Sequence, residues 1–141
     1  MTPALLVNID VDDLDRAVAF YTRLLGVAVG RRFGAMGIEL LGGSAPIYLL
    51  AKAPGTPASP SSTDQRRYDR HWTPVHLDFA VPDLEQALAV ALAAGATQEG
   101  ATAIQRWGKI ARLADPFGHG FCLIEFTGRG YDEVATDASQ T

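Results

Sequence analysis

His76 and Asp78 are the two residues of this chain whose types and spacing are best suited to chemistry. They lie in the alternating segment Val75-His76-Leu77-Asp78-Phe79, so both side chains point to the same face of a predicted strand. A histidine beside a carboxylate can act as a general base that the carboxylate orients. The same local spacing occurs in metal sites built from two histidines and one carboxylate.

Each of these roles competes with a simpler one. Asp78 could hydrogen-bond His76, or pair with Arg112, for purely structural reasons. A metal site would need a third ligand. The candidates for that ligand are Glu39, Cys122 and the loop residue His71.

The segment around His76 belongs to an internal repeat, because residues 7–50 and 75–126 are two copies of one pattern. In each copy an alternating apolar run reaches an Asp, an amphipathic stretch follows, and a Gly closes it. Asp13 and Asp83 predict helix N-caps, and Gly26 and Gly95 predict the left-handed residues that end the helices. Equivalent positions of two such copies face each other across a pseudo-two-fold axis, so site residues can be sought as matched sets. Further strands are predicted over 36–41, 46–52, 109–114 and 120–126.

The stretch between the copies breaks the pattern. Residues 53–70 are rich in Pro and Ser and show neither helical nor strand periodicity, which is typical of a linker. They form either a connector or a flap over a pocket, with Trp72 as a stacking surface. The polar tail after Phe126 is expected to fray.

Composition excludes several classes of protein. The chain has 141 residues, of which 48% are hydrophobic, enough for one domain with one core. Its net charge of −4 and its scattered basic pairs do not predict a nucleic-acid partner. No apolar run approaches the roughly 20 residues of a membrane span, and no signal segment is visible. The single cysteine, Cys122, suits a reducing compartment, so a cytoplasmic location is expected.

Two motifs carry a family resemblance. The first motif lies in the first predicted helix and consists of Asp13-Leu14-Asp15-Arg16-Ala17 with Phe20-Tyr21 and Leu25-Gly26. The second motif spans the turn before the last predicted strand and the start of that strand, and reads Asp115-Pro116-Phe117-Gly118-His119-Gly120-Phe121-Cys122-Leu123. Together they resemble the vicinal oxygen chelate superfamily, which includes glyoxalase I, bleomycin resistance proteins and extradiol dioxygenases. The second motif is similar to a glyoxalase-like subgroup.

The resemblance implies an α+β fold of two tandem βαβββ modules that form a curved mixed-sheet cavity. Residues 1–126 would be one such domain, with a first module at about 5–52, a linker at 53–72 and a second module at about 73–126. Residues 127–141 would be a polar tail. Single chains of this kind generally resemble symmetric homodimers.

Strand alternation then divides the side chains between a helix face and a cavity face. The apolar alternates, which include Val7, Ile9, Val11, Val75, Leu77, Phe79 and Val81, should face the helices. The predicted ligand-binding residues are Asn8, Asp10, Glu39, Tyr48, Trp72, His76, Trp107, Arg112 and Cys122.

The resemblance also locates the metal ligands of the metal-dependent members. The equivalent positions here are Leu6, Tyr48, His76 and Cys122, of which only His76 is a regular ligand. We therefore expect no metal and no cofactor, and a divalent ion at His76 is disfavoured.

Three functions follow in order of preference. The first is a metal-independent binding protein, similar to the bleomycin resistance members, that sequesters a planar or aromatic small molecule. The second is a lyase or isomerase in which His76 is the catalytic base and Asp78 orients it. The third, a metal-dependent glyoxalase or dioxygenase, is less favoured because of Leu6 and Cys122. Whether the chain is an enzyme stays open at this point.

Overall fold

The computed structural model describes residues 1–136 of the chain, which divide into two compact units. The first consists of Met1–Arg70 together with Pro116–Gly118. The second consists of His71–Asp115 and the chain from His119 onward. Most of the predicted linker thus belongs to the first unit.

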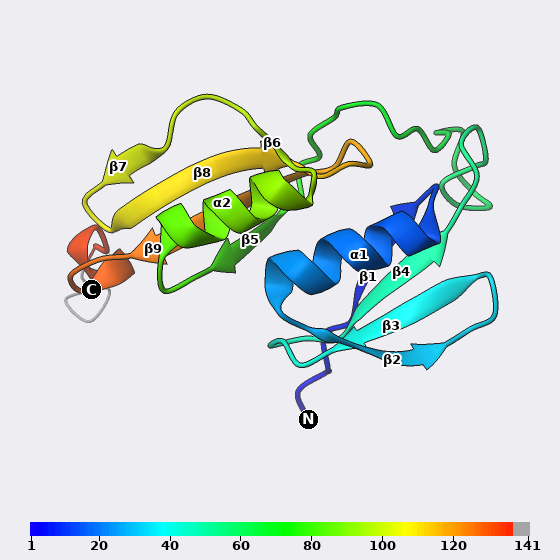
Figure 1. Cartoon of the computed structure of the whole chain (residues 1–141), viewed down its shortest axis with the longest axis horizontal. Coiled ribbons are helices and arrows are strands. Elements are labelled where there is room, and N and C mark those ends of the chain that lie inside the picture. Colours follow the sequence, from blue (N-terminus) through cyan, green and yellow to red (C-terminus); the bar gives the residue numbers. More distant parts are fainter. Residues whose placement is uncertain (137–141) are drawn as a thin grey trace. The chain divides into compact units, whose positions relative to one another are not determined.

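The first unit is one βαβββ module (Figure 1). Its elements are β1 (Val7–Val11), α1 (Leu14–Leu25), β2 (Ala28–Arg32), β3 (Gly37–Leu41) and β4 (Ile47–Ala51). The strand order is β1-β4-β3-β2; β1 and β4 are parallel and the other pairs are antiparallel. Phe20 and Tyr21 of α1 are buried, as are Val11 and Leu49 of the sheet, so the core lies between the helix and one sheet face.

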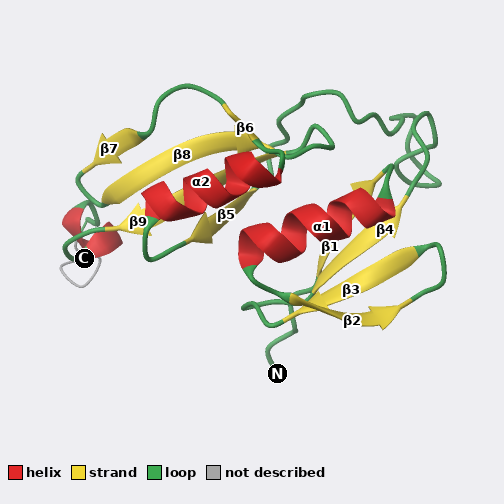
Figure 2. Ribbon diagram, in the orientation of Figure 1, coloured by secondary structure: helices red, strands yellow, loops and turns green. Residues whose placement is uncertain are grey.

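The second unit repeats this module with one change (Figure 2). Its elements are β5 (Leu77–Ala80), α2 (Leu84–Ala94), β6 (Thr97–Gln98), β7 (Ala103–Gln105), β8 (Gly108–Ala114) and β9 (Gly120–Phe126). β5 and β9 are parallel, and β8 pairs antiparallel with β9. Both β6 and β7 pair with β8, so the strand equivalent to β2 is broken into two short pieces. The predicted α+β fold of two βαβββ modules is confirmed.

Both helices begin and end where the local pattern predicts. The Asp13 carboxylate accepts a hydrogen bond from the Arg16 backbone N–H, and Asp83 accepts one from the Gln86 N–H. Gly26 closes α1 with φ +65°, in the left-handed region that favours glycine. The same capping arrangement in both modules thus fixes the residue at which each helix begins after its first strand.

Three predictions about the second unit and the tail need correction. Val75 lies outside β5 and is 83% exposed, because the partner strand β9 begins only at Gly120 and leaves nothing opposite it to pair with. The apolar spacing of α2 predicts that Leu92 lies on the buried helix face, but it is 43% exposed. Residues 130–133, in the tail expected to fray, form a 3₁₀ helix, because Tyr131 packs on Trp107 and Phe126. The remainder of the predicted tail, 137–141, lies outside the described residues.

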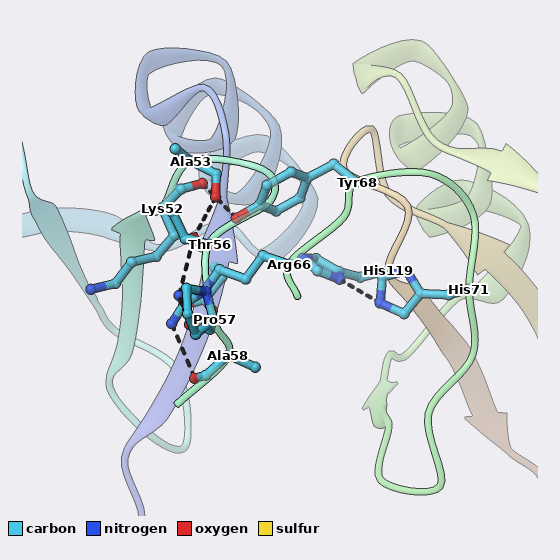
Figure 3. Close-up of polar contacts among 10 residues, drawn as sticks. Lys52, Ala53, Thr56, Pro57, Ala58, Arg66, Tyr68, His71 and His119 are labelled. Atoms are coloured by element: carbon cyan, nitrogen blue, oxygen red, sulfur yellow. Dashed lines mark hydrogen bonds and ion pairs between the residues drawn. The ribbon is translucent and has the colours of Figure 1, made fainter. Parts of the chain in front are cut away.

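The loop from 53 to 70 is an ordered part of the first unit (Figure 3). Its two arms join through backbone hydrogen bonds from Gly55 N to Arg66 O and from Arg66 N to Thr56 O, each 2.8 Å long. The Arg66 side chain also donates to the Asp10 carboxylate at 2.7 Å and to carbonyl oxygens of the loop, including that of Pro57. Tyr68 Oη donates to the Lys52 carbonyl oxygen at 2.7 Å. These contacts make the loop a braced structure, which the Pro- and Ser-rich composition did not indicate.

Gly118 is the point where the Asp-Pro-Phe-Gly turn meets this loop. A Cβ at Gly118 would lie 2.2 Å from the Asp69 carbonyl oxygen and 2.9 Å from that of Tyr68, and its φ is +85°. Gly100 has a similar φ, +76°, but nothing lies within 4 Å of a Cβ built there. Alanine at either position would suffer the strain of a left-handed backbone, but only alanine at position 118 would also clash with neighbouring atoms.

We predict that Gly118→Ala destabilises the protein far more than Gly100→Ala. The left-handed backbone costs each variant about 1–2 kcal/mol, whereas the clash at position 118 adds at least about 2 kcal/mol. Urea denaturation followed by circular dichroism measures both. Equal losses of stability in the two variants would contradict the close approach of Asp69 to Gly118.

Candidate functional site

Strand register aligns one row of polar residues in each unit. Asn8 pairs with Tyr48, and Tyr48 with Glu39, across β1, β4 and β3. In the second unit Asp78 pairs with Cys122 of β9. Cys122 in turn lies opposite Arg112 of β8. Glu39 and Arg112 thus hold equivalent positions in the two modules.

The row in the first unit is closed by an ion pair. Arg31 donates through Nε and Nη2 to both carboxylate oxygens of Glu39, at 3.0 Å to Oε1 and 2.6 Å to Oε2. Tyr48 Oη donates to the same carboxylate at 2.9 Å. A Cβ at Gly30 would lie 2.6 Å from Glu39 Oε1, so the glycine leaves room for the carboxylate to reach the Arg31 backbone N–H. Two predicted ligand-binding residues, Glu39 and Tyr48, therefore bind each other and Arg31.

This arrangement sets the ionisation of Glu39. The hydrogen bonds from Arg31 lower the pKa of Glu39 from 4.5 to about 2, although burial of the carboxylate opposes the shift. The side chain of Glu39 is only 4% exposed, while that of Arg31 is 71% exposed. Glu39 therefore stays ionised over the whole physiological pH range, and the Arg31 guanidinium balances its charge.

The second unit gathers three donor groups. His76, Asp78 and Cys122 present one ligand atom each, all within 4.8 Å of one another. His76 Nε2 lies 3.3 Å from Asp78 Oδ1, and both side chains are well exposed, at 40% and 37%. Burial, followed by the influence of Asp78, raises the pKa of the Cys122 thiol to about 11. The group thus combines an exposed His76–Asp78 pair with a buried thiol that stays protonated at neutral pH.

Trp72 borders the same group. Its ring centroid lies 5.5 Å from that of His76, with the two planes at 83°. Its Nε1 donates to Glu99 Oε1 at 3.0 Å. The indole and the imidazole therefore meet edge to face beside Asp78, and Trp72 is 41% exposed.

The remaining predicted site residues have other partners. Asp10 binds Arg66 of the loop, and Trp107 packs against Phe126 and Tyr131 with centroid distances of 6.0 and 5.2 Å. Asn8 and Arg112 are exposed at their register positions. A ligand-binding role for these four residues stays a prediction.

His71 and His119 form a separate pair, visible in Figure 3. His71 Nε2 lies 3.3 Å from His119 Nδ1, and the two backbones form a parallel bridge. The Asp115 carboxylate accepts a hydrogen bond from the His119 N–H, which closes the turn before β9. Of the two possible third ligands within the second unit, His71 and Cys122, it is Cys122 that joins the His76–Asp78 pair in the group of three.

Sequence reasoning missed Arg31, Arg66, Glu99 and Gly120. Arg31 lies on β2, a strand whose five residues are all exposed and which therefore carries no alternation signal. Arg66 and Glu99 lie in segments without periodicity, and their partners are distant in the sequence. Gly120 lies within the recognised turn motif, but glycine in a turn gives no sign of an indole above it.

Comparison with known proteins agrees with this architecture. A family model described as a glyoxalase-like domain matches residues 6–124, so the chain belongs to the glyoxalase-like family of the vicinal oxygen chelate superfamily. A search of curated protein sequences gave no match. No helix within residues 1–136 is long and apolar enough to cross a membrane.

Solved structures share the fold at low sequence identity. The genomically encoded fosfomycin resistance protein FosX from Listeria monocytogenes is 15% identical, with a TM-score of 0.70 over 96% of this chain and 99% of that one. A glyoxalase/bleomycin resistance protein/dioxygenase family enzyme from Burkholderia phytofirmans is 22% identical, with a TM-score of 0.64 over 86% and 97%. A lactoylglutathione lyase from Agrobacterium tumefaciens is 17% identical, with a TM-score of 0.60 over 89% and 94%. At these identities the likeness concerns the fold alone.

The donor chemistry of the four positions named by the family resemblance does not fit the family's metal. Leu6 offers no ligand atom. The Tyr48 hydroxyl donates a hydrogen bond to the Glu39 carboxylate, whose charge Arg31 balances. Cys122 is a buried thiol with a raised pKa. Only His76 of the four is a ready nitrogen donor.

The depressed pKa of Glu39 predicts how stability changes with acid. A carboxyl whose pKa is lower in the folded state contributes stability above its unfolded pKa, and that contribution is lost as pH falls toward the folded value. We expect this contribution to disappear between about pH 4.5 and pH 2. Glu39→Gln should therefore lose less stability than the native chain over this interval in urea denaturation. Asp64→Asn, on the exposed loop, is the control for removing one negative charge; identical pH profiles for Glu39→Gln and the native chain would contradict the pairing.

Proposed function

We propose that this protein binds a planar or aromatic small molecule at the second unit and sequesters it without a metal ion. The observation that carries the proposal is the group formed by Trp72, His76 and Asp78. All three side chains are more than a third exposed, so a ligand in solvent can reach an aromatic surface, an imidazole and a carboxylate together.

The chemistry of this group suits recognition of a flat ring with polar substituents. The indole supplies dispersion and π contact, while the imidazole and carboxylate offer directional hydrogen bonds. The alternative donors in the first unit are occupied, because Glu39 is held by Arg31 and Tyr48. The support for metal independence is this engagement of Glu39 and Tyr48, together with Leu6, which offers no ligand atom at another of the family's metal positions.

A second candidate function is a lyase or isomerase of the same superfamily. The distance of 3.3 Å between His76 Nε2 and Asp78 Oδ1 favours it, since Asp78 can accept a hydrogen bond from Nε2–H. The imidazole would then carry its lone pair on Nδ1 and could take a proton from a carbon or hydroxyl of a bound substrate. The lactoylglutathione lyase among the similar structures is an enzyme, which shows that the fold accommodates such chemistry.

We also propose a cytoplasmic homodimer. A reduced, buried Cys122 is compatible with a reducing compartment. An isologous dimer is the usual assembly of small proteins of this kind. Light scattering of the purified chain checks the dimer, and a monomer at micromolar concentration would contradict it.

Binding assays separate the two functions. Metal-free bleomycin and the flat dye proflavine are suitable probes, each titrated against the native chain and against Trp72→Leu. Stacking on an aromatic side chain contributes about 0.5–1.5 kcal/mol, so we expect Trp72→Leu to weaken binding by up to about tenfold. Ile104→Ala, at an exposed apolar residue of the same unit, should leave the affinity unchanged.

The fate of the ligand completes the test. For a sequestering protein, mass spectrometry should recover each probe unchanged after long incubation. Conversion of a probe by the native chain but not by His76→Ala would establish the lyase or isomerase reading instead. Failure of both flat probes to bind in a saturable way would contradict the proposed function.

A further inference from the structure

The Trp72 indole rests on the backbone of Gly120. A Cβ built at Gly120 would lie 2.5 Å from Cδ2, 2.6 Å from Cε2 and 2.7 Å from Cε3 of the indole. These three atoms belong to the six-membered ring, and the nearly equal distances place Gly120 against the face of the ring and not its edge. Any side chain at position 120 would therefore displace the indole.

Two further contacts hold the ring in this place. The indole Nε1 donates to Glu99 Oε1 at 3.0 Å, and the Glu99 backbone N–H donates to the Arg112 carbonyl oxygen of β8 at 2.8 Å. The bridge between His71 and His119 aligns the backbone on the N-terminal side of Trp72 with the residue before Gly120. The indole is thus held by the Gly120 backbone against its face, by the Glu99 carboxylate at its N–H, and by the His71–His119 bridge next to it in the chain.

We propose that Gly120 and Glu99 are positioning residues that hold the Trp72 indole as a preformed stacking surface for a flat, electron-poor or cationic aromatic ring beside His76. This inference rests on the proposed function and adds to it the class of ring and the residues that prepare the surface. The face of an indole carries negative potential, which favours such rings, and the hydrogen bond to Glu99 holds that face in place.

Preparation of the surface has a consequence for affinity. A ring that is already fixed loses no rotamer freedom when a ligand stacks on it, whereas a mobile ring must be ordered during binding. Loosening the indole should thus weaken ligand binding even when Trp72 itself is unchanged.

The experiment uses the full chain with Trp107→Phe, which leaves Trp72 as its only tryptophan. Gly120→Ala, Glu99→Ala and Glu99→Gln are compared in this background by time-resolved fluorescence anisotropy, with no ligand present. Gly120→Ala and Glu99→Ala should increase the local motion of the indole. Glu99→Gln should restore the order of the parent, because its side-chain carbonyl oxygen still accepts the indole hydrogen bond.

Proflavine titration then measures the effect on binding. We expect its affinity to fall by about 3- to 10-fold in Gly120→Ala and Glu99→Ala and to stay near the parent value in Glu99→Gln. Gly43→Ala is the matched glycine control, because a Cβ there meets its nearest neighbour at an ordinary 3.6 Å. The Glu99 pair keeps the test decisive if Gly120→Ala fails to fold.

The possible results separate the two proposals. Unchanged anisotropy in both Gly120→Ala and Glu99→Ala would overturn the positioning role, whatever proflavine does. Increased indole motion with unchanged proflavine affinity would overturn the claim that a fixed Trp72 indole strengthens stacking of the ligand. If the parent itself does not bind proflavine while the anisotropy responds as expected, the proposed function fails, and the preformed ring surface remains as a structural feature.

Discussion

The parallel pairing of the first and last strand of each module is the constraint on which the rest of the site depends. This pairing sets Asn8 opposite Tyr48 in one unit and Asp78 opposite Cys122 in the other. Because side chains alternate along a strand, it also sends their apolar neighbours toward the helices. The polar groups of each unit therefore lie mainly in these two rows, with His76 and Trp72 beside the row of the second unit.

The two rows carry different chemistry although the backbone that holds them is the same. In the first unit a carboxylate on the third strand is neutralised by Arg31 and bonded by a tyrosine hydroxyl. In the second unit the third strand carries Arg112 and the first strand carries the carboxylate, Asp78, which pairs with His76. The two units therefore share one scaffold, but the polar groups of the first form an ion pair, whereas His76 and Asp78 of the second are exposed.

The sequence predicted those parts of the structure that depend on local signals. Asp13 and Asp83 as caps and Gly26 as a left-handed terminus follow from residue type and spacing, and the structure has them as predicted. The strand β2 gave no such signal, because all of its residues are exposed. The partner of Glu39 was consequently missed, since Arg31 lies on that strand. The bracing of the loop by Arg66 depends on contacts between residues distant in the sequence, which periodicity does not report.

We propose that this chain holds no metal ion, because Leu6 offers no ligand atom and the Tyr48 hydroxyl is bonded to a carboxylate whose charge Arg31 balances, which leaves two of the family's four metal positions without a ready donor. Anaerobic titration of the reduced protein with Co²⁺, followed by optical absorption, tests it most directly, because a thiolate bound to cobalt gives an intense near-ultraviolet charge-transfer band. We predict no saturable band at equimolar Co²⁺. A stoichiometric band that disappears in both Cys122→Ser and His76→Ala would contradict the claim and would show that the group of His76, Asp78 and Cys122 is a metal site.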